Sequence, residues 1–364
     1  MAEIPFVPGL ELSRLLYTEI VRPVLERDFS GLIYAAARLG SGSEVLGYDT
    51  PMSTDHDWAP TVQLYVAPDQ LAAAGAIRAA VAAALPERFY GYATQGVPGA
   101  QRPELPQAGD GSDPRLHPVW ITTVAEFSEQ QLGWDPAEPL TPAHWLAWPQ
   151  QQLLQVTAGT LFHDGVGDLT ALRNRLAWYP HDLWLYLLAA GWQRIAEEEH
   201  LMPRAGFVGD ELGSALIGAR LVHDIMALAF LQERRYAPYP KWFGTAFSRL
   251  DASSALHPGL MQAMTAATWP ARETALVELY LKVAQNQNRL QLAPVQREEL
   301  DLFFGRPFRV LFAGRFADAL AAQITDPAMR RLAGQRLIGA VDQWSDSTVL
   351  RCHSARWAVV RQMY

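Results

Sequence analysis

The sequence predicts an α+β protein, in which an N-terminal mixed sheet with helices precedes a mostly α-helical domain. Two short apolar runs, residues 32–39 and 61–66, have the length and composition of buried strands. From about Ser128 onward, strand patterns give way to long segments with apolar residues at helical spacing. We therefore expect a sheet-containing domain over residues 1–127 and a helical domain over residues 128–364.

Helical segments flank the two predicted strands of the first domain. Residues 10–29 have apolar side chains at helical spacing, with a proline that kinks or breaks the helix, and residues 71–85 form an Ala-rich helix. Residues 92–118 are dense in Gly, Pro and Asp and are typical of a long loop. After this loop, residues 117–127 alternate with period two, which predicts a third strand.

The second domain has its clearest helix patterns at residues 181–200, 211–235 and 271–290. In each segment the apolar positions repeat every three or four residues, as they do on the buried face of a helix. No internal repeat and no low-complexity tail is present. A packed set of helices is therefore the expected architecture.

Composition limits the class of protein and its location. The chain has 364 residues, of which 49% are hydrophobic, and this is enough for two domains with substantial cores. Its N-terminus lacks a basic start followed by an apolar core, and no stretch approaches the ~20 apolar residues of a membrane span. The single cysteine, Cys352, allows neither an intramolecular disulfide nor a cysteine-based zinc cluster. We therefore expect a cytoplasmic protein without a membrane partner.

The charge balance disfavours a long nucleic acid as a partner. The formal net charge is −8, and no run rich in Lys or Arg is present. Proteins that hold long RNA or DNA usually carry a basic stripe. A small molecule or a protein is the expected partner instead.

The most informative stretch runs from Gly40 to Trp58, with the sequence GSGSEVLGYDTPMSTDHDW. It follows the predicted strand at residues 32–39, so its Gly/Ser turn lies at a strand end. Without a Cβ, Gly40 and Gly42 let backbone amides approach a phosphate closely, and the neighbouring serines add hydroxyl donors. The turn has the composition of an anion-binding loop.

Two aspartates, Asp55 and Asp57, follow within the same stretch. If they open the strand that continues through residues 61–66, their side chains point to one face while that of His56 points to the other. Two hard carboxylates on one face suit Mg²⁺ or Mn²⁺, which also bind the phosphates of a nucleotide. Glycine, serine and aspartate dominate ordinary turns as well, so a chance occurrence in a loop is the alternative.

A glycine-serine pair followed at this distance by Asp-x-Asp resembles the signature of the polymerase-β-like nucleotidyltransferase superfamily. The resemblance implies a nucleotidyltransferase-like mixed sheet that carries the site, and a helical partner domain. It also implies that Gly42 and Ser43 bind the phosphates of a nucleoside triphosphate (NTP) and that Asp55 and Asp57 are the catalytic metal ligands. The site would lie in the cleft between the two domains.

The words GSEVLGYD and STDHDW are closer still to a bacterial family known only as domain of unknown function 4037. Two further stretches, YAPYPKWF at residues 236–243 and IGAVDQWSDST at residues 338–348, are similar to the same family. The likeness would cover most of the chain. The family name carries no established substrate.

Superfamily members generally place a third carboxylate on a neighbouring strand, where it completes the metal site or accepts the proton of the attacking hydroxyl. The predicted strand at residues 117–127 has none within its alternating run, and Trp120 stands where the family often has an acidic residue. Glu126, at the strand end, is the remaining candidate. A solvated acidic residue that opens the next helix is the commoner explanation of Glu126.

Lys241, within Pro240-Lys241-Trp242, is the candidate nucleotide-binding residue of the helical domain. Lysine is scarce in this chain, and helical-domain lysines of this superfamily often contact the triphosphate or the leaving pyrophosphate. An exposed loop lysine beside an aromatic residue that packs the domain is the alternative.

These features together lead to an expected reaction, the Mg²⁺-dependent transfer of a nucleoside monophosphate from an NTP to a hydroxyl of a small molecule or a protein. Two alternatives are open. A nucleotide-binding pseudoenzyme or regulator would bind Mg·NTP without turnover. A toxin–antitoxin component would modify a partner protein.

Overall fold

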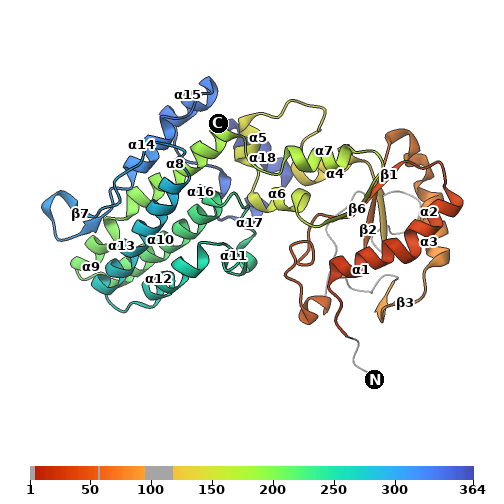
Figure 1. Cartoon of the computed structure of the whole chain (residues 1–364), viewed down its shortest axis with the longest axis horizontal. Coiled ribbons are helices and arrows are strands. Elements are labelled where there is room, and N and C mark those ends of the chain that lie inside the picture. Colours follow the sequence, from red (N-terminus) through yellow and green to blue (C-terminus); the bar gives the residue numbers. More distant parts are fainter. Residues whose placement is uncertain (1–4, 56–57, 95–117) are drawn as a thin grey trace. The chain divides into compact units, whose positions relative to one another are not determined.

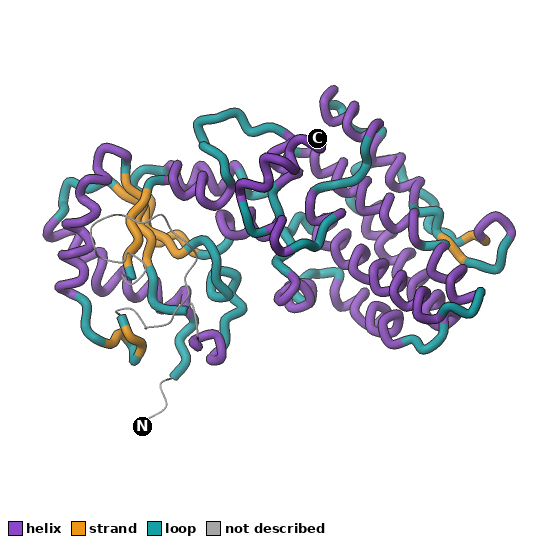
Figure 2. The backbone as a smooth tube through the Cα atoms, turned by 180° about the vertical axis from the view of Figure 1, so that it is seen from behind, coloured by secondary structure: helices purple, strands orange, loops and turns teal. Residues whose placement is uncertain are grey.

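A computed structural model of the chain describes residues 5–55, 58–94 and 118–364. The chain divides into two compact units, which are described separately. Unit 1 comprises Met1–Pro139 and Gln152–Ala177, and unit 2 comprises Leu140–Gln151 and Trp178–Tyr364. Strands are concentrated in unit 1, whereas unit 2 is almost entirely helical (Figure 2).

The elements of unit 1 are short and alternate between helix and strand (Figure 1). They are α1 (Gly9–Leu16), a π-helical turn (Tyr17–Val21), α2 (Arg22–Asp28), β1 (Tyr34–Arg38), a 3₁₀ turn (Pro51–Asp55), β2 (Val62–Val66), a second 3₁₀ turn (Pro68–Ala73), α3 (Ala74–Ala84), β3 (Arg88–Phe89), β4 (Tyr92–Ala93), β5 (Val119–Thr122), α4 (Val124–Leu132), α6 (Gln150–Thr157), β6 (Thr160–Asp164) and α7 (Asp168–Arg175). The first two residues of α6, Gln150 and Gln151, belong to unit 2.

The main sheet of unit 1 has the strand order β5-β2-β1-β6. β1 pairs antiparallel with β2 and with β6, and β2 pairs parallel with β5. In this register Ala37 lies opposite Gln63, which in turn lies opposite Trp120. The C-terminal end of β1 and the N-terminal ends of β2 and β5 therefore lie together at one end of the sheet.

Hydrophobic packing covers one face of this sheet with helices from the N-terminal part of the chain. Val62, Leu64 and Val66 alternate along β2 and belong to one buried cluster with Leu12 of α1 and Ile77 of α3. Side chains of a strand alternate between its two faces, so the residues between them point to the other face. That second face is in contact with α4, as the packing of Tyr65 against Phe127 shows, with ring centroids 5.3 Å apart.

The structure corrects two expectations about strands. The strand predicted at residues 117–127 is shorter, because Thr123 caps α4 and so ends β5 at Thr122. Strands also do not cease at Ser128: β6 pairs with β1, and unit 1 therefore continues beyond residue 127. β6 lies at the sheet edge and is only half-buried, so its sequence lacks the continuous apolar run of a central strand.

The elements of unit 2 form a set of packed helices and one short hairpin. They are α5 (Pro142–Ala147), α8 (His181–Glu198), α9 (Leu201–Phe207), α10 (Glu211–Gln232), α11 (Pro240–Phe247), α12 (Ser253–Thr265), α13 (Trp269–Arg289), β7 (Asp301–Leu302), β8 (Arg309–Val310), α14 (Gly314–Ala321), α15 (Pro327–Gln335), α16 (Val341–Trp344), α17 (Thr348–Arg351) and α18 (Ser354–Val360).

Helices α8, α10 and α13 form the centre of unit 2 (Figure 1). Trp192 of α8 is fully buried and stacks on Phe316 of α14, with ring centroids 4.4 Å apart. Its indole N–H donates to the Gln287 side chain of α13 over 3.0 Å. The long apolar segments of the sequence are thus explained by burial in this bundle.

Helix α10 is the only described helix with the length and hydropathy of a membrane span. Its mean hydropathy is 1.5, and 56% of the apolar window is buried within the protein. A mostly buried core helix passes the same test of length and hydropathy.

Candidate functional site

The Gly/Ser turn of the sequence forms a loop directly after β1. Gly40 and Gly42 have φ angles of 89° and 131°, a backbone region that favours glycine. The Gly40 N–H donates to the Gln155 carbonyl over 2.7 Å, and the Gly159 N–H donates to the Val45 carbonyl over 3.0 Å. The last turn of α6 and Gly159, just after that helix, therefore hold the two ends of the loop.

A buried ion pair stabilises this loop from inside. The Arg38 guanidinium at the end of β1 contacts the Glu44 carboxylate, and their side chains are only 8% and 3% exposed. Arg38 also donates to the carbonyl oxygens of Leu39 and Ser41. A charge buried this deeply requires a partner, so each member of the pair holds the other in the loop.

The side chain of Gln63 in β2 completes this support. Its Oε1 accepts the Leu39 N–H over 2.7 Å, and its Nε2 donates to the Leu39 carbonyl over 3.0 Å. The Gln63 side chain thus supplies the two backbone hydrogen bonds that a neighbouring strand would give Leu39, just after β1 ends. The loop is built by Arg38, Glu44 and Gln63, none of which the sequence analysis identified. The signal that could have found them is a charged residue at the end of a fully apolar strand.

Gly42 and Ser43, the predicted phosphate-binding residues, are partly exposed on this loop. Among the residues that the structure describes, neither backbone N–H donates a hydrogen bond. Ser43 contributes only its carbonyl, which accepts the Tyr48 N–H over 2.9 Å. Within the described residues these two amides thus have no acceptor, and phosphate binding by Gly42 and Ser43 stays a prediction.

A third aspartate of the same stretch, Asp49, has structural partners. The Asp49 carboxylate accepts the N–H of Gly9 at the start of α1 over 2.7 Å. It also accepts the indole N–H of Trp58 over 3.0 Å. Asp49 therefore ties the loop to α1 and is not free to bind a ligand with that oxygen.

The predicted metal ligands are only partly described. Asp55 ends the 3₁₀ turn Pro51–Asp55, and Asp57 lies outside the described residues. The expectation that Asp55 opens the strand is wrong, since β2 begins at Val62. Two hydrogen bonds form the turn: the Ser53 N–H donates to the Thr50 carbonyl, and the Thr50 N–H donates to the Ser53 hydroxyl. No cluster of three metal-ligating side chains occurs in the described part of the chain.

β5, which has the sequence VWIT, contributes no carboxylate at the end of the sheet where the loop after β1 lies. Trp120 lies opposite Gln63 in the register. Glu126 accepts the Thr123 N–H over 3.2 Å and the Thr122 hydroxyl over 2.9 Å, while its own N–H donates to the Thr123 hydroxyl. This is a capping box at the start of α4, so Glu126 has the helix-opening role that was the alternative to catalysis.

Lys241 belongs to unit 2, where it lies in the first turn of α11. Its side chain is exposed, and its Nζ lies 4.9 Å from the ring centroid of Trp242. The lysine is therefore a cation presented to solvent beside an aromatic ring. This geometry fits both the nucleotide-binding prediction and the alternative of an ordinary exposed lysine.

A polar junction missed by the sequence analysis positions the segment before Lys241. The Gln150 N–H donates to the Asp342 carboxylate over 2.5 Å, and the Gln150 side chain accepts the Ala237 N–H over 2.7 Å. Arg351 forms an ion pair with Asp342 at 3.2 Å. The stretches 236–243 and 338–348, which the sequence analysis singled out separately, are thus joined through one glutamine.

Burial raises the pKa of Asp342, an effect that Arg351 and the Gln150 N–H partly offset. A buried carboxylate with these two partners holds Gln150 firmly in place. Because the donor and the acceptor are 192 residues apart, no local pattern could reveal the contact.

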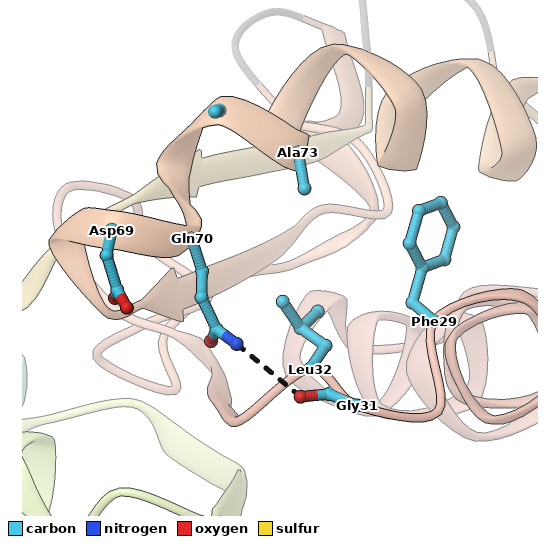
Figure 3. Close-up of a pocket in the computed structure, with 7 residues that line it drawn as sticks. Phe29, Gly31, Leu32, Asp69, Gln70 and Ala73 are labelled. Carbon is cyan, nitrogen blue, oxygen red and sulfur yellow. Dashed lines mark hydrogen bonds between the residues drawn. The ribbon is translucent and has the colours of Figure 1, made fainter.

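A pocket in unit 1 lies away from the Gly/Ser loop (Figure 3). Its lining residues come from the segments before β1 and after β2, and they are Phe29, Gly31, Leu32, Asp69, Gln70, Ala72 and Ala73. The Gln70 side chain bridges these segments by donating to the Gly31 carbonyl over 3.4 Å. The pocket is at the opposite end of β1 from Gly40 and has no part in the predicted site.

Comparison with known proteins gives one match. Residues 145–243 match the family model described as "Domain of unknown function (DUF4037)". No curated protein and no solved structure matches the chain. The matched range includes the predicted residue Lys241 and the stretch 236–243, but not the Gly/Ser loop. Over residues 145–243 the chain is therefore similar to the DUF4037 family.

Proposed function

We propose that this chain is a Mg²⁺-dependent nucleotidyltransferase, which moves a nucleoside monophosphate from an NTP to a hydroxyl of a small molecule or a protein. The observation that carries the proposal is the loop after β1. Its two partly exposed amides at Gly42 and Ser43 have no partner among the described residues, and a buried ion pair holds the loop in shape. Such a set of fixed N–H groups is suited to phosphate oxygens.

The sheet topology supports the same assignment. The loop after β1 and the start of β2 lie at the same end of the sheet, because β1 and β2 are antiparallel neighbours. Asp55 and Asp57 would hold Mg²⁺ there, and the metal would neutralise phosphate charge. The acceptor oxygen would form a bond to the α-phosphorus as the bond to the β-phosphate oxygen breaks, and pyrophosphate would leave. Positioning and charge neutralisation supply most of the catalysis in such transfers.

A second function, a nucleotide-binding regulator without turnover, is favoured by one observation. The described part of β5 has no carboxylate, and Glu126 is engaged in the capping box of α4. Without a group to accept the proton of the attacking hydroxyl, the same loop and metal pair would bind Mg·NTP and hold it.

The experiment incubates the protein with Mg²⁺ and each α-labelled NTP, and follows both pyrophosphate release and label incorporation. An Asp55→Asn/Asp57→Asn double variant is compared with Asp69→Asn, a control that changes an exposed carboxylate at the other end of the sheet. Turnover in the wild type and the control but not in the double variant supports transfer. Label on protein identifies a protein acceptor, including the toxin–antitoxin alternative. Binding of Mg·NTP without pyrophosphate release from any acceptor supports the regulator.

A further inference from the structure

A short hairpin of unit 2 presents an exposed aromatic side chain at its turn. The hairpin joins β7 to β8 at one end of the helices, and its turn contains Phe303 and Phe304 (Figure 1). Phe304 is 77% exposed, and its φ of 48° lies in the left-handed region that favours glycine. Backbone strain of this kind gathers at surfaces that bind a ligand or a partner.

A buried carboxylate fixes the surroundings of this turn. Glu199, which is 4% exposed, accepts the N–H groups of Leu311 and Ala313 over 2.7 and 2.9 Å. Phe312 stands between these two residues, and its φ of 54° is left-handed as well. Its ring centroid lies 6.0 Å from that of Phe304. The aromatic side chains are therefore held in place before any partner binds.

Two arginines without a negative partner lie beside the same turn. The guanidinium carbons of Arg204 in α9 and of Arg306 lie 5.9 and 5.7 Å from the ring centroid of Phe303. Both residues are exposed, and neither side chain forms an ion pair or a hydrogen bond within the described part of the chain. His200 stacks on Phe303 with ring centroids 4.3 Å apart. Two like charges around one ring repel each other, so this surface favours a negatively charged group.

The apolar part of the surface continues onto α9. Phe207 is 60% exposed, and its ring centroid lies 5.4 Å from that of Phe308 in the hairpin. Val208, the next residue, is 78% exposed. Exposed apolar side chains that lie together mark interaction surfaces. The surface is therefore wider than a single anion needs, and its size suits a segment of polypeptide.

We propose that Arg204, Phe207, Phe304 and Arg306, together called the Phe304 surface, bind an acidic segment of a partner protein. Aromatic and arginine side chains are enriched in protein–protein interfaces. The arginines would pair with carboxylates of the partner, and the phenyl rings would cover its apolar side chains. A net charge of −8 makes the rest of the chain repel the same partner, which directs it to this surface. The proposal holds whether or not the chain transfers a nucleotide.

The test measures binding of a fluorescein-labelled acidic peptide, GEEFEELEEG, to the full chain by fluorescence polarisation. A neutral peptide of the same length, GQQFQQLQQG, is the control for its charge. We expect saturable binding of the acidic peptide, about tenfold tighter than binding of the neutral one. Absence of saturable binding up to about 1 mM, or equal affinity for both peptides, would overturn the proposal.

The arginines are tested with a matched pair of double variants. Arg204→Gln/Arg306→Gln is compared with Arg289→Gln/Arg331→Gln, which removes the same charge from exposed positions outside the Phe304 surface. We expect about tenfold weaker binding of the acidic peptide to the first variant and wild-type binding to the second. Equal losses in both variants would show a response to net charge alone and would overturn the assignment.

Phe304→Asn keeps the test decisive if the arginine variants do not fold. Asparagine adopts the left-handed region more readily than phenylalanine, so the midpoint of urea denaturation should not fall. Binding of the acidic peptide should nevertheless weaken about fivefold, because an exposed aromatic contact is lost. Wild-type affinity in this variant would contradict docking on the Phe304 surface.

Two further readouts identify other occupants. A dimer in sedimentation velocity that Arg204→Gln/Arg306→Gln dissociates would assign the surface to a second copy of the chain. Tighter binding of labelled oligothymidylate than of the acidic peptide, at the same ionic strength, would assign it to a nucleic acid. Either result would overturn an acidic protein segment as the occupant. None of these measurements needs metal or turnover, so failure of this inference is distinguishable from failure of the proposed transfer.

Discussion

A side chain on Gly42 would overlap the carboxylate of Glu44. The glycine is therefore needed for two reasons, its φ of 131° and the space that the buried Glu44 fills. Phosphate-binding loops use glycine for close approach of a ligand, and here the glycine also admits an internal carboxylate. The loop is thus a rigid part of the fold before any ligand binds.

Gly42→Ala is expected to destabilise the protein by about 2–4 kcal/mol, because it strains the backbone and displaces Glu44 from Arg38. Gly47→Ala is the matched control, since Gly47 also has a positive φ of 68° but open space around it. We expect the control to cost about 1 kcal/mol. Urea denaturation of both variants measures the difference, and equal losses would refute the role of Glu44.

Glu44→Gln should cost about 3–5 kcal/mol, because it leaves the Arg38 guanidinium buried without its negative partner. Replacing both residues, in Arg38→Met/Glu44→Leu, should recover much of this loss. A double-mutant cycle by denaturation, made of Arg38→Met, Glu44→Leu and the double variant, measures the coupling. If the two single changes are additive in the double variant, the pair has no energetic link.

The main sheet could be predicted in part from the sequence, and the reason lies in burial. β1 and β2 are fully buried, so residues 32–39 and 61–66 are mostly apolar, with Arg38 and Gln63 as polar exceptions. β6 is a half-buried edge strand, and its sequence TLFHD offers no such signal. The long helices α8, α10 and α13 were predicted because each buries a large apolar surface in the bundle.

The candidate site could be predicted only where a motif is local. The Gly/Ser loop after β1 follows from its composition, and its glycines have the expected positive φ angles. The buried partners Glu44 and Arg38, and the Gln150–Asp342 contact, depend on tertiary packing. A sequence does not state which charged residue is buried against which, so these contacts required the structure.

The free energy of unfolding should depend on pH through Glu199. This carboxylate accepts the N–H groups of Leu311 and Ala313, at 2.7 and 2.9 Å, but burial dominates and raises its pKa to about 7. The folded chain therefore keeps a proton that the unfolded chain releases above pH ~4.5. Stability from this group is complete below that pH and falls by up to about 3 kcal/mol as pH rises to 7.

Glu199→Gln removes this titration, so it serves as the reference for the pH effect. The difference in unfolding free energy between the wild type and the variant is measured at pH 5, 6 and 7. The wild type should lose unfolding free energy relative to Glu199→Gln as pH rises. A difference that is constant over this range would show that Glu199 does not titrate as expected.

Glu126→Gln should leave any nucleotide transfer unchanged within about twofold, because glutamine serves equally well in the capping box of α4. Thr123→Ala should cost about 1 kcal/mol of stability through loss of the same cap. Initial rates and denaturation curves check the two changes. A large rate loss in Glu126→Gln at unchanged stability would make Glu126 the missing carboxylate.

Lys241→Met should raise KM for the NTP about tenfold, because one exposed cation is lost from the nucleotide. Stability should change by less than about 0.5 kcal/mol, as expected at an exposed position. Lys282→Met is the control, since that lysine donates to the Ala255 carbonyl and has no assigned role. An unchanged KM in Lys241→Met would leave Lys241 as an ordinary surface lysine.

The central claim is that the loop after β1 and the two aspartates hold a metal-bound nucleotide, whether or not transfer follows. The most direct measurement is calorimetric titration of a non-hydrolysable NTP analogue with and without Mg²⁺, into the wild type, Asp55→Asn/Asp57→Asn and Asp69→Asn. We predict Mg²⁺-dependent binding to the wild type and to Asp69→Asn, and at least tenfold weaker binding to the double variant. Absence of binding to the wild type, or equal affinity in all three proteins, would contradict the account.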